Sequence, residues 1–521
     1  MATTTNYIEL HCHTNFSFLD GASPPEELLR RAAELEMPAL AVTDHQGLYG
    51  AVKFRNAGQE RGVRPIFGAE IEVAGEGAAG EHGGAGAGHL ILLVESAAGW
   101  SNLCRMLSHA GFAGSKHARP VPWSLLDRFS DGLICLTGCR DGVLATPARR
   151  ADKETTLARG RSLKRIFGVD HCYVELQRHL DGGDKRLNAT LLALARHLGL
   201  PVVATNNVHY ATAEGVPLQH VLTCIRHLTT LDAAESLLYA TPHRYLKSPR
   251  EMADLFSDLP EAVANTARIA DACAYELDHS HARLPDFPVP PGETPFSYLA
   301  DLAYAGLRRK YDPVTPAAMA QLARELSLIE KNGLAEYFLV VRGICRFAQE
   351  EGIVGQGRGS AAGSIVAYTL GITAVDPIAQ DLLFDRFLSE DSHATPDIDI
   401  DFAANRREEV IQYVYGRYGA EYTAMVANVV TFRARSAVAD VGKVLGFPAD
   451  LLAKVREALY TRSADEIAPD LAEATDFAGK LTHLPWRMLL DLCGQISGYP
   501  RHLSIHNGGM LVTGEPLAGL V

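Results

Sequence analysis

The sequence predicts an α/β protein in which a seven-stranded β/α barrel comes first and a mixed α+β domain follows. Short apolar runs alternate with helical patterns through the first half of the chain. A proline-rich stretch, "LPDFPVPPGETP" at 284–295, then predicts a linker. Beyond it, helical patterns surround a glycine–serine loop and a strand of alternating aspartates. A chain of 521 residues is too long for one hydrophobic core, so it should divide into several domains.

The barrel is predicted from apolar runs that are each short enough for a buried strand. Seven runs qualify, at 7–11, 39–43, 64–70, 89–94, 132–138, 172–176 and 201–205. Short strands that alternate with helices predict a parallel sheet covered on both faces, and seven of them suit a closed or nearly closed barrel. The first helix, at 23–35, shows a capping box with Ser23 as N-cap and Glu26 three residues later. The glycine-rich segment 75–88 predicts a surface loop.

The composition excludes several classes of protein. Hydrophobic residues make up 47% of the chain and charged residues 21%, as in ordinary globular domains. Nine cysteines without a CxxC pair favour reduced thiols, and neither a secretory signal nor a membrane-spanning run is visible. We therefore expect a cytoplasmic protein without a membrane partner. The net charge of −13 does not exclude nucleic acid, because binding depends on where the basic residues cluster.

Residues able to ligate metals recur where the predicted strands end. They are His11, His13, Asp44, His45, Glu70, Cys139 and His209, with His89 at the head of the fourth strand. An extended chain turns His11 and His13 to one face and Cys12 to the other. A single histidine or cysteine at a strand end is more often a core residue than a ligand. So many strand ends at one rim nevertheless favour a site for more than one divalent metal, suited to activating water against a phosphate ester.

A second candidate site lies in "GQGRGSAAGSIVAYTLGI" (355–372) and "TPDIDIDF" (395–402). Glycines beside small hydroxylated residues let backbone amides approach an anion, although a tight turn into a helix explains the loop nearly as well. Alternation along the strand turns Asp397, Asp399 and Asp401 to one face. Their charges repel one another unless cations lie between them, and two Mg²⁺ ions about 3.5–4 Å apart would relieve that repulsion. The alternative is an edge strand with a solvated acidic face.

The barrel motifs resemble a known family. "HCHT…FLDG", "AVTDHQGLYG", "FGAE", "HLILLV", "LTGC" and "NNVHY" are similar to the polymerase-and-histidinol-phosphatase (PHP) domain, a seven-stranded barrel that binds up to three metals. The resemblance implies Zn²⁺ or Mn²⁺ at the ligand positions, which are His11, His13, Asp20, His45, Glu70, His89, Cys139 and His209. The chain departs from the family at Asn207, where metal-competent members have Asp. Because Asn keeps an oxygen but loses the charge, we expect a barrel that binds metal for stability and has weak or no 3′–5′ exonuclease activity.

The second site resembles the palm of bacterial C-family DNA polymerases, the family of the replicative polymerase III alpha subunit. The resemblance implies a nucleotidyltransferase-like palm whose contacts to the incoming triphosphate are Arg358, Gly359, Ser360, Ser364 and Arg386. It also implies that Asp397 and Asp399 hold Mg²⁺, a choice that strand geometry leaves open with Asp401. Ser392 stands where the family often has an arginine, so one phosphate contact is missing or replaced.

Basic residues follow the acidic strand. Arg433, Arg435 and Lys443 predict a small helical thumb that contacts duplex phosphates, with a solvated helical face as the alternative. "HLSIHNGGMLV" at 502–512 resembles the HxGG element at which the chain returns to the palm. The predicted domains are a PHP metal-binding barrel at 1–278, a linker at 279–295, the palm at 296–428, the thumb at 429–497 and a truncated return to the palm at 498–521.

Several motifs resemble the error-prone, damage-tolerant branch of the family, which has "GQGRGS" where the replicative branch more often has GPGRGS. This implies a DNA-directed DNA polymerase of DNA replication, repair and damage tolerance, with primer–template DNA and deoxynucleoside triphosphates as substrates. The family's third carboxylate is expected beyond Val521, together with contacts to a sliding clamp and damage-tolerance accessory proteins. We therefore expect residues 1–521 to be a fragment that does not polymerise DNA by itself.

Three alternative functions remain. The first is a replicative polymerase III alpha subunit with an active PHP exonuclease. The second is a stand-alone PHP phosphoesterase, such as a histidinol-phosphatase relative, which leaves residues 284–521 without a purpose. The third is a non-catalytic product whose barrel serves as a folding and docking platform.

Overall fold

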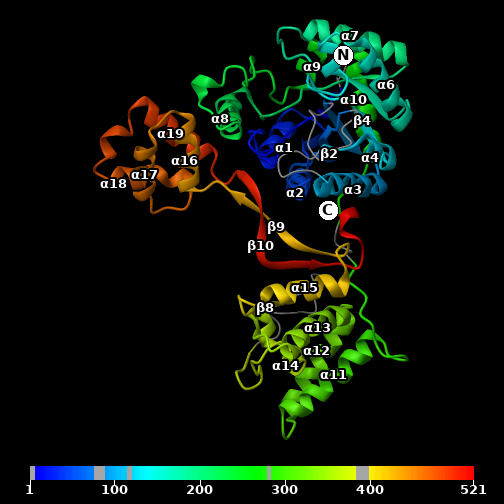
Figure 1. The fold of residues 1–521 in the computed structure, drawn as a ribbon, viewed down its shortest axis with the longest axis vertical. Coiled ribbons are helices and arrows are strands. Elements are labelled where there is room, and N and C mark those ends of the chain that lie inside the picture. Colours follow the sequence, from blue (N-terminus) through cyan, green and yellow to red (C-terminus); the bar gives the residue numbers. More distant parts are fainter. Residues whose placement is uncertain (1–5, 76–87, 114–119, 279–282, 383–397, 521) are drawn as a thin grey trace. The chain divides into compact units, whose positions relative to one another are not determined.

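The computed structural model describes residues 6–75, 88–113, 120–278, 283–382 and 398–520 (Figure 1). The loop predicted at 75–88 therefore lies almost wholly outside the described residues, as do Arg386, Ser392 and Asp397. The chain forms two compact units. The first joins Met1–Leu277 to Asn428–Ser504 and Ala518–Val521, and the second joins Asp278–Ala427 to Ile505–Leu517.

The first unit contains a six-stranded sheet with the strands in chain order. The strands are β1 (Ala39–His45), β2 (Arg64–Val73), β3 (Gly88–Val94), β4 (Leu133–Leu136), β5 (Cys172–Leu176) and β6 (Val202–Ala204). The predicted α/β class is confirmed, and each of these strands overlaps one of the predicted apolar runs. The number of strands differs, because six rather than seven are regular.

The run at 7–11 is not a regular strand, although it lies where the seventh would be. It contacts β1 through Ala41 N, which donates to Glu9 O at 3.0 Å, and it forms an isolated bridge between Cys12 and Val208 just after β6. The Glu9 carboxylate accepts hydrogen bonds from the backbone N–H groups of His11 and Asn206. Because a side chain takes these donors, the regular ladder is interrupted, and the barrel is closed by single backbone hydrogen bonds.

The prediction of an all-parallel sheet is wrong for β3, which pairs antiparallel with both β2 and β4. The other neighbours, β1 with β2, β4 with β5 and β5 with β6, are parallel. Because β3 runs in the opposite direction, its first residues lie at the rim where the other strands end. This reversal explains how His89, at the head of a strand, reaches the same rim as residues that follow strand ends.

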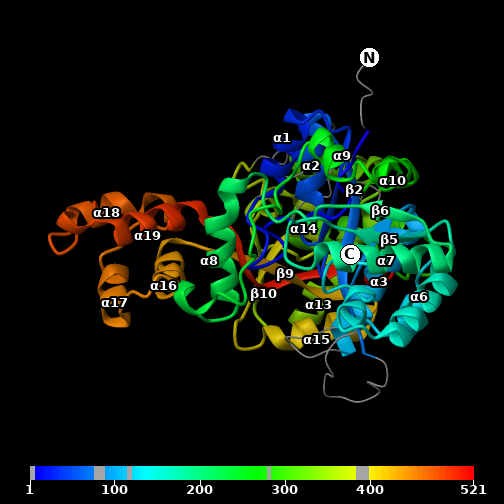
Figure 2. The same cartoon turned by 90° about the horizontal axis from the view of Figure 1, so that it is seen from above.

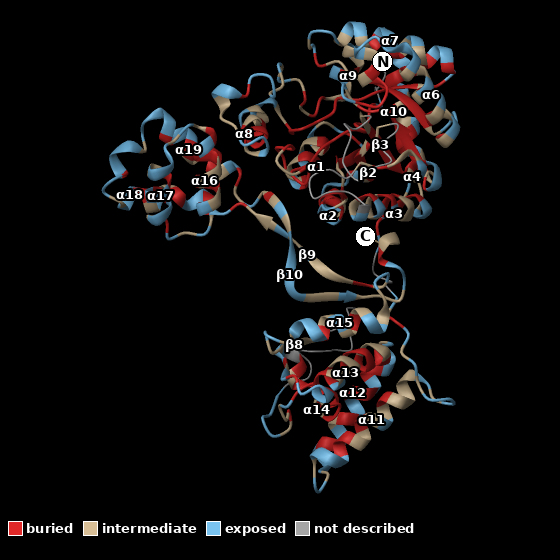
Figure 3. Cartoon of the chain, in the orientation of Figure 1, coloured by how far each residue is buried: buried red, intermediate tan, exposed pale blue. Residues whose placement is uncertain are grey.

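Helices cover the outside of the sheet, with α6 and α7 packed against β5 (Figures 1 and 2). The helices of this region are α1 (Pro25–Glu34), α2 (Ala51–Arg61), α3 (Ala97–Ala113), α4 (Trp123–Arg128), α5 (Ala145–Arg149), α6 (Lys153–Phe167), α7 (Asp184–Leu198), α8 (Val216–Arg226), α9 (Pro249–Leu255) and α10 (Pro260–Ala272). Figure 3 shows the sheet as the buried centre of this region. The predicted capping box of α1 is wrong. Pro24 is the N-cap, and Ser23 Oγ instead accepts a hydrogen bond from Ala211 N at 3.0 Å.

The first unit also contains a group of short helices within the predicted thumb. They are α16 (Ala434–Val444), α17 (Ala449–Glu457), α18 (Ile467–Glu473) and α19 (Leu484–Gln495). The apolar faces of α16 and α19 meet in a core that contains Val438, Val441 and Leu489. Arg433, Arg435 and Lys443 remain exposed on this group.

The second unit is built mainly from helices. They are α11 (Pro295–Lys310), α12 (Pro316–Lys331), α13 (Ala335–Glu350), α14 (Ile365–Thr369) and α15 (Arg407–Tyr418). Thr294 caps α11 and Pro295 occupies its first turn, so the predicted linker ends at a helix start. Leu299, Ala303 and Leu307 recur every four residues along α11 and form one buried face.

Two strand pairs complete the fold. β7 (Gly355–Arg358) pairs antiparallel with β8 (Asp399–Phe402) in the second unit. The longer strands β9 (Thr423–Thr431) and β10 (Pro500–Val512) form a two-stranded sheet, and β10 contains the predicted HxGG element. None of the helices in the described residues has both the length and the apolar character needed to cross a bilayer. The domain boundaries expected from the sequence remain predictions.

Candidate functional site

The predicted metal ligands of the barrel form one connected cluster around the carboxylate of Glu70 on β2. Glu70 Oε1 lies 2.9 Å from His45 Nδ1 and 2.8 Å from His89 Nδ1. Glu70 Oε2 lies 2.9 Å from His11 Nε2 and 3.8 Å from His13 Nε2. Four histidines from three separate segments of the chain thus contact one carboxylate.

Asp20 is the second carboxylate of the cluster. Its Oδ2 lies 2.7 Å from His45 Nε2 and 3.6 Å from His209 Nε2. The rings of His13 and His45 stack with their centroids 4.3 Å apart, and Cys139 Sγ lies 3.9 Å from His89 Nδ1. The structure therefore brings all of the predicted barrel ligands together.

The cluster is closed on one side and open on the other. His11 and His13 are fully buried, whereas the side chains of His45 and His89 are 24% and 35% exposed. Cys139 is also partly exposed. A small ligand can therefore approach from the side of β3 and the chain after β4.

Electrostatic interactions hold the cluster together. Burial raises the pKa of Glu70, but His89 and His45 beside it hold that pKa well below its usual value. Burial lowers the pKa of His45, yet Glu70 and Asp20 raise it to about 9. Carboxylates and protonated imidazoles thus neutralise one another, and a divalent cation would supply the same positive charge to the same oxygens.

Three of the histidines present Nε2 to the cluster while a neighbour occupies Nδ1. His11 Nδ1 contacts Glu175 Oε1 at 2.6 Å, and His13 Nδ1 contacts Ser17 Oγ at 3.1 Å. His209 Nδ1 donates to the backbone oxygen of Asn207 at 2.9 Å. Ligand histidines in metal sites are held in this way, through the ring nitrogen that does not bind the metal.

Asn207 has a strained position next to the cluster. Its φ of 46° is in the left-handed region, and its side-chain Oδ1 is buried with no hydrogen-bond partner among the described residues. A buried amide oxygen without a partner costs free energy. The carboxylates and the converging imidazoles fit a divalent metal, and Asn207 adjoins this group through its backbone oxygen, which accepts from His209 Nδ1.

Some residues near the rim differ from the prediction or were missed. Asp44, at the end of β1, accepts hydrogen bonds from Thr14 and Ser17 and does not join the cluster. Tyr239 was missed, and its hydroxyl lies 3.0 Å from His209 Nε2. Glu175 was also missed, although a glutamate inside the apolar run 172–176 was a visible signal. Nothing in the pattern around Tyr239 marks it.

The second candidate site is the antiparallel strand pair of β7 and β8. Arg358 is opposite Asp399 in the register, and its NH1 lies 3.4 Å from Asp399 Oδ2. Arg358 Nε also lies 3.0 Å from an oxygen of Asp401. Gly359 follows with a φ of 67°, a conformation that glycine adopts without strain. The predicted basic loop and acidic strand are thus adjacent.

Two of the remaining residues predicted at this site, Ser364 and Ser360, lie in the described part of the chain. Ser364 is buried, where it caps α14 and donates a hydrogen bond to Glu325 Oε2 at 2.8 Å. Its hydroxyl is therefore engaged inside the unit, and Ser360 lies in the short 3₁₀ turn Gly359–Gly363 between Arg358 and this cap. Asp397 and Arg386 lie outside the described residues.

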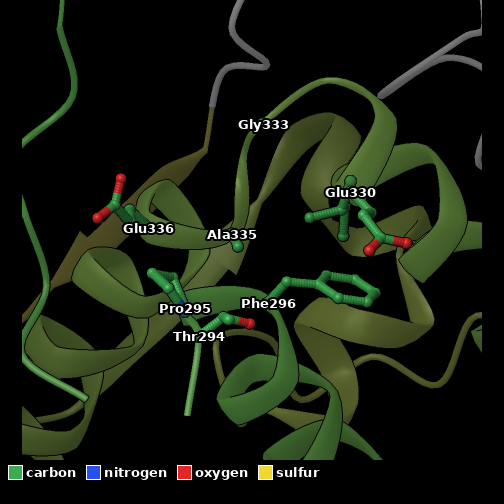
Figure 4. A pocket seen from close by; sticks show the side chains of 8 residues that line it. Thr294, Pro295, Phe296, Glu330, Gly333, Ala335 and Glu336 are labelled. Carbon is green, nitrogen blue, oxygen red and sulfur yellow. The ribbon is translucent and has the colours of Figure 1, made fainter. Parts of the chain in front are cut away.

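A separate cavity of about 210 Å³ lies at the start of α11 (Figure 4). It is lined by Thr294, Pro295, Phe296, Ile329, Glu330, Gly333, Ala335 and Glu336. None of the predicted site residues takes part, so this cavity is not one of the candidate sites.

Comparisons with known proteins follow the same division of the chain. Residues 9–179 match the model of the PHP domain, and residues 297–521 match that of the bacterial DNA polymerase III alpha NTPase domain. The error-prone DNA polymerase of Mycobacterium bovis is 40% identical over 99% of this chain and 47% of its own length. That of Cutibacterium acnes is 42% identical over 98% of this chain and 44% of its own length. The chain thus spans about half the length of the curated relatives it matches.

One similar solved structure is a two-domain protein from Bacteroides vulgatus that contains a predicted PHP-like metal-dependent phosphoesterase. The match covers 48% of this chain and 63% of the Bacteroides chain. It is 14% identical, with a TM-score of 0.26. The assignment therefore relies on the sequence relatives. Residues 9–179 thus match the PHP domain family, residues 297–521 match the bacterial DNA polymerase III alpha NTPase domain family, and the chain as a whole is similar to bacterial error-prone DNA polymerases.

Proposed function

We propose that this chain is the N-terminal part of an error-prone DNA-directed DNA polymerase that copies primer–template DNA in damage tolerance. The observation that carries the proposal is the 40% identity to a polymerase of that name over 99% of the chain. Further support is that the PHP match at 9–179 and the polymerase match at 297–521 occur in the same chain. Each of the two matched regions contains residues of one of the two candidate sites. A stand-alone phosphoesterase does not account for the matched region at 297–521.

In this proposal the β7–β8 strand pair is the part of the palm that binds the triphosphate. Two Mg²⁺ ions at Asp397 and Asp399 would stabilise the charge that develops in nucleotidyl transfer. Asp399 and Arg358 are about half exposed, at 45% and 58%, so both can reach a nucleotide. The Arg358 guanidinium then binds the phosphates of the incoming deoxynucleoside triphosphate.

The proposed DNA contacts are on the exposed basic side chains of the thumb. Arg433, Arg435 and Lys443 would contact backbone phosphates, a contact that positions the duplex without reading its sequence. Contacts with a sliding clamp and with accessory proteins of damage tolerance are proposed for the whole protein, in the cytoplasm.

The first test compares Asp399→Asn with Asp401→Asn in the whole protein. Both changes remove one charge from the same face of β8, but only Asp399 is proposed to hold metal. We expect Asp399→Asn to abolish primer extension and Asp401→Asn to retain most of it, measured at saturating Mg²⁺. Equal loss in both variants would overturn the assignment of Asp399.

We further propose that the barrel holds Zn²⁺ or Mn²⁺ for stability and has weak or no 3′–5′ exonuclease activity, because Asn207 provides an oxygen without a charge. The rival proposal, an active proofreading barrel, is favoured by the completeness of the cluster around Glu70 and Asp20. Elemental analysis and an exonuclease assay on a 3′-labelled primer separate the two proposals.

We expect Asn207→Asp to hold more metal than the wild-type protein, because an added carboxylate binds a divalent cation more strongly than an amide. Asn56→Asp, an exposed change on α2 away from the cluster, is the control and should leave the metal content unchanged. A wild-type protein that holds its full metal set and degrades primers would support the active exonuclease instead.

A further inference from the structure

Glu175 on β5 is a buried carboxylate outside the predicted ligand set. It is 1% exposed, and its Oε1 lies 2.6 Å from His11 Nδ1. The same oxygen accepts hydrogen bonds from Gln177 Nε2 at 2.7 Å and from the hydroxyl of Thr205. Oε2 is buried and finds no hydrogen-bond partner among the described residues.

Stability alone does not account for a carboxylate at this position. A buried carboxylate costs free energy unless its charge is compensated and both oxygens are hydrogen-bonded. Glu175 Oε1 accepts several donors, but Oε2 is left without one. An amide side chain would keep an acceptor for these donors without a buried charge, so the charge of Glu175 needs another explanation.

The contact with His11 provides that explanation because it fixes the orientation of the imidazole. With Nδ1 held by Glu175, Nε2 lies 2.9 Å from Glu70 Oε2 and 3.1 Å from His13 Nε2. A carboxylate on the outer nitrogen of a histidine fixes the ring and makes the other nitrogen a stronger ligand. His13 and His209 have neutral partners at the same position, a hydroxyl and a backbone carbonyl.

We propose that Glu175 is a positioning residue of the barrel's metal centre, which orients His11 through Nδ1 and thereby raises the affinity for the ion that His11 Nε2 would ligate. This inference relies on the proposed function, in which the barrel holds a divalent transition-metal ion. Gln177 and Thr205 in turn hold Glu175 in place, so the imidazole is fixed by a network that runs from β5 to the chain after β6.

The chain offers a matched control in Glu9. Glu9 is also a fully buried glutamate at the barrel, with hydrogen bonds from the backbone N–H of His11 and from the hydroxyl of Tyr7. It contacts no imidazole among the described residues. Glu9→Gln therefore alters a buried carboxyl group at the same depth without changing the contact to a ligand side chain.

The experiment measures Zn²⁺ and Co²⁺ affinity of the purified chain by competition with a chromophoric chelator. The proteins are wild type, Glu175→Leu, Glu175→Gln and Glu9→Gln, and circular dichroism reports folding. We expect about 10–100-fold weaker binding in Glu175→Leu. The metal affinity of Glu175→Gln should lie between those of the wild type and Glu175→Leu, because its amide oxygen still accepts a hydrogen bond from His11 Nδ1. Glu9→Gln should bind metal as the wild type does, and only the Glu175 variants should change the visible Co²⁺ spectrum.

Each outcome decides a question. If wild type binds metal and both Glu175 variants bind it as tightly as Glu9→Gln, the positioning role is wrong while the metal centre stands. If wild type binds no metal, the metal centre of the proposed function fails, and the role of Glu175 fails with it. If Glu175→Leu does not fold, Glu175→Gln decides, because an unchanged affinity and Co²⁺ spectrum in that variant would also overturn the role.

Discussion

Lys247 is a cationic side chain buried close to the metal cluster. It is 6% exposed, and its ammonium donates to Asn206 Oδ1 at 2.9 Å and to the backbone oxygen of His243. Burial lowers its pKa from 10.5 to about 8, against the opposing effect of Glu9 and Glu251, while Arg244 lowers it further. The folded protein therefore releases this proton at a lower pH than the unfolded chain.

This shift has a defined sign for stability. Between pH 8 and pH 10.5 the unfolded chain binds more protons at Lys247 than the folded protein, so the contribution of Lys247 to the free energy of unfolding rises with pH across that window. Below pH 8 the full penalty for burying the charge applies.

We therefore expect the melting temperature of the wild type to rise relative to that of Lys247→Met as the pH increases from 7.5 to 10. The exposed Lys53→Met variant, as control, should keep a constant difference from wild type. A constant difference for Lys247→Met as well would contradict the lowered pKa.

At the scale of elements, the start of α14 depends on a carboxylate from another helix. Glu325 on α12 is fully buried and accepts hydrogen bonds from Ile365 N and Val366 N, both at 3.1 Å, and from the hydroxyl of Ser364. These are the N–H groups that a helix start leaves without internal partners. Because α14 directly follows the Arg358 loop, Glu325 also anchors the end of that loop.

We expect Glu325→Gln to lower the free energy of unfolding of the second unit by about 1–3 kcal/mol, because an amide NH₂ would face N–H donors. Glu330→Gln, an exposed change on the same helix, is the control and should have little effect. Urea unfolding followed by circular dichroism measures both, and equal midpoints would show that the cap adds no stability.

The elements also show where sequence reasoning succeeds and where it stops. Apolar runs located β1 to β6 because burial on both faces leaves a plain hydrophobic pattern. The direction of β3 could not be predicted, since alternation and hydrophobicity are the same for either direction. The prediction of a regular strand at 7–11 is wrong because the Glu9 carboxylate accepts hydrogen bonds from backbone N–H groups that a neighbouring strand would otherwise bind. The prediction of Ser23 as an N-cap is wrong because its hydroxyl oxygen accepts a hydrogen bond from Ala211 N instead.

At the scale of the whole molecule, the sequence located the candidate ligands better than the groups that contact them. His11, His45 and the other predicted barrel ligands all converge, because ligand-type residues at strand ends are visible in the sequence. Tyr239 could not be assigned with them, and Glu175 was visible only as a glutamate in an apolar run, since the contacts of both depend on distances across the barrel rather than on spacing along the chain. The palm residue Ser364 proved to be buried, which its motif does not reveal.

The closing of the barrel by the bridge between Cys12 and Val208 has a consequence for synthesis. His11 leaves the ribosome early, but His209, its partner in the cluster, follows roughly 200 residues later, which at typical translation rates is on the order of 10–40 s. During that interval a nascent barrel has Glu70 and several imidazoles but lacks its last ligand and its last edge. The proposed metal centre would therefore mark the completion of the domain, because the full set of candidate ligands exists only after the final strand has docked on the first segment.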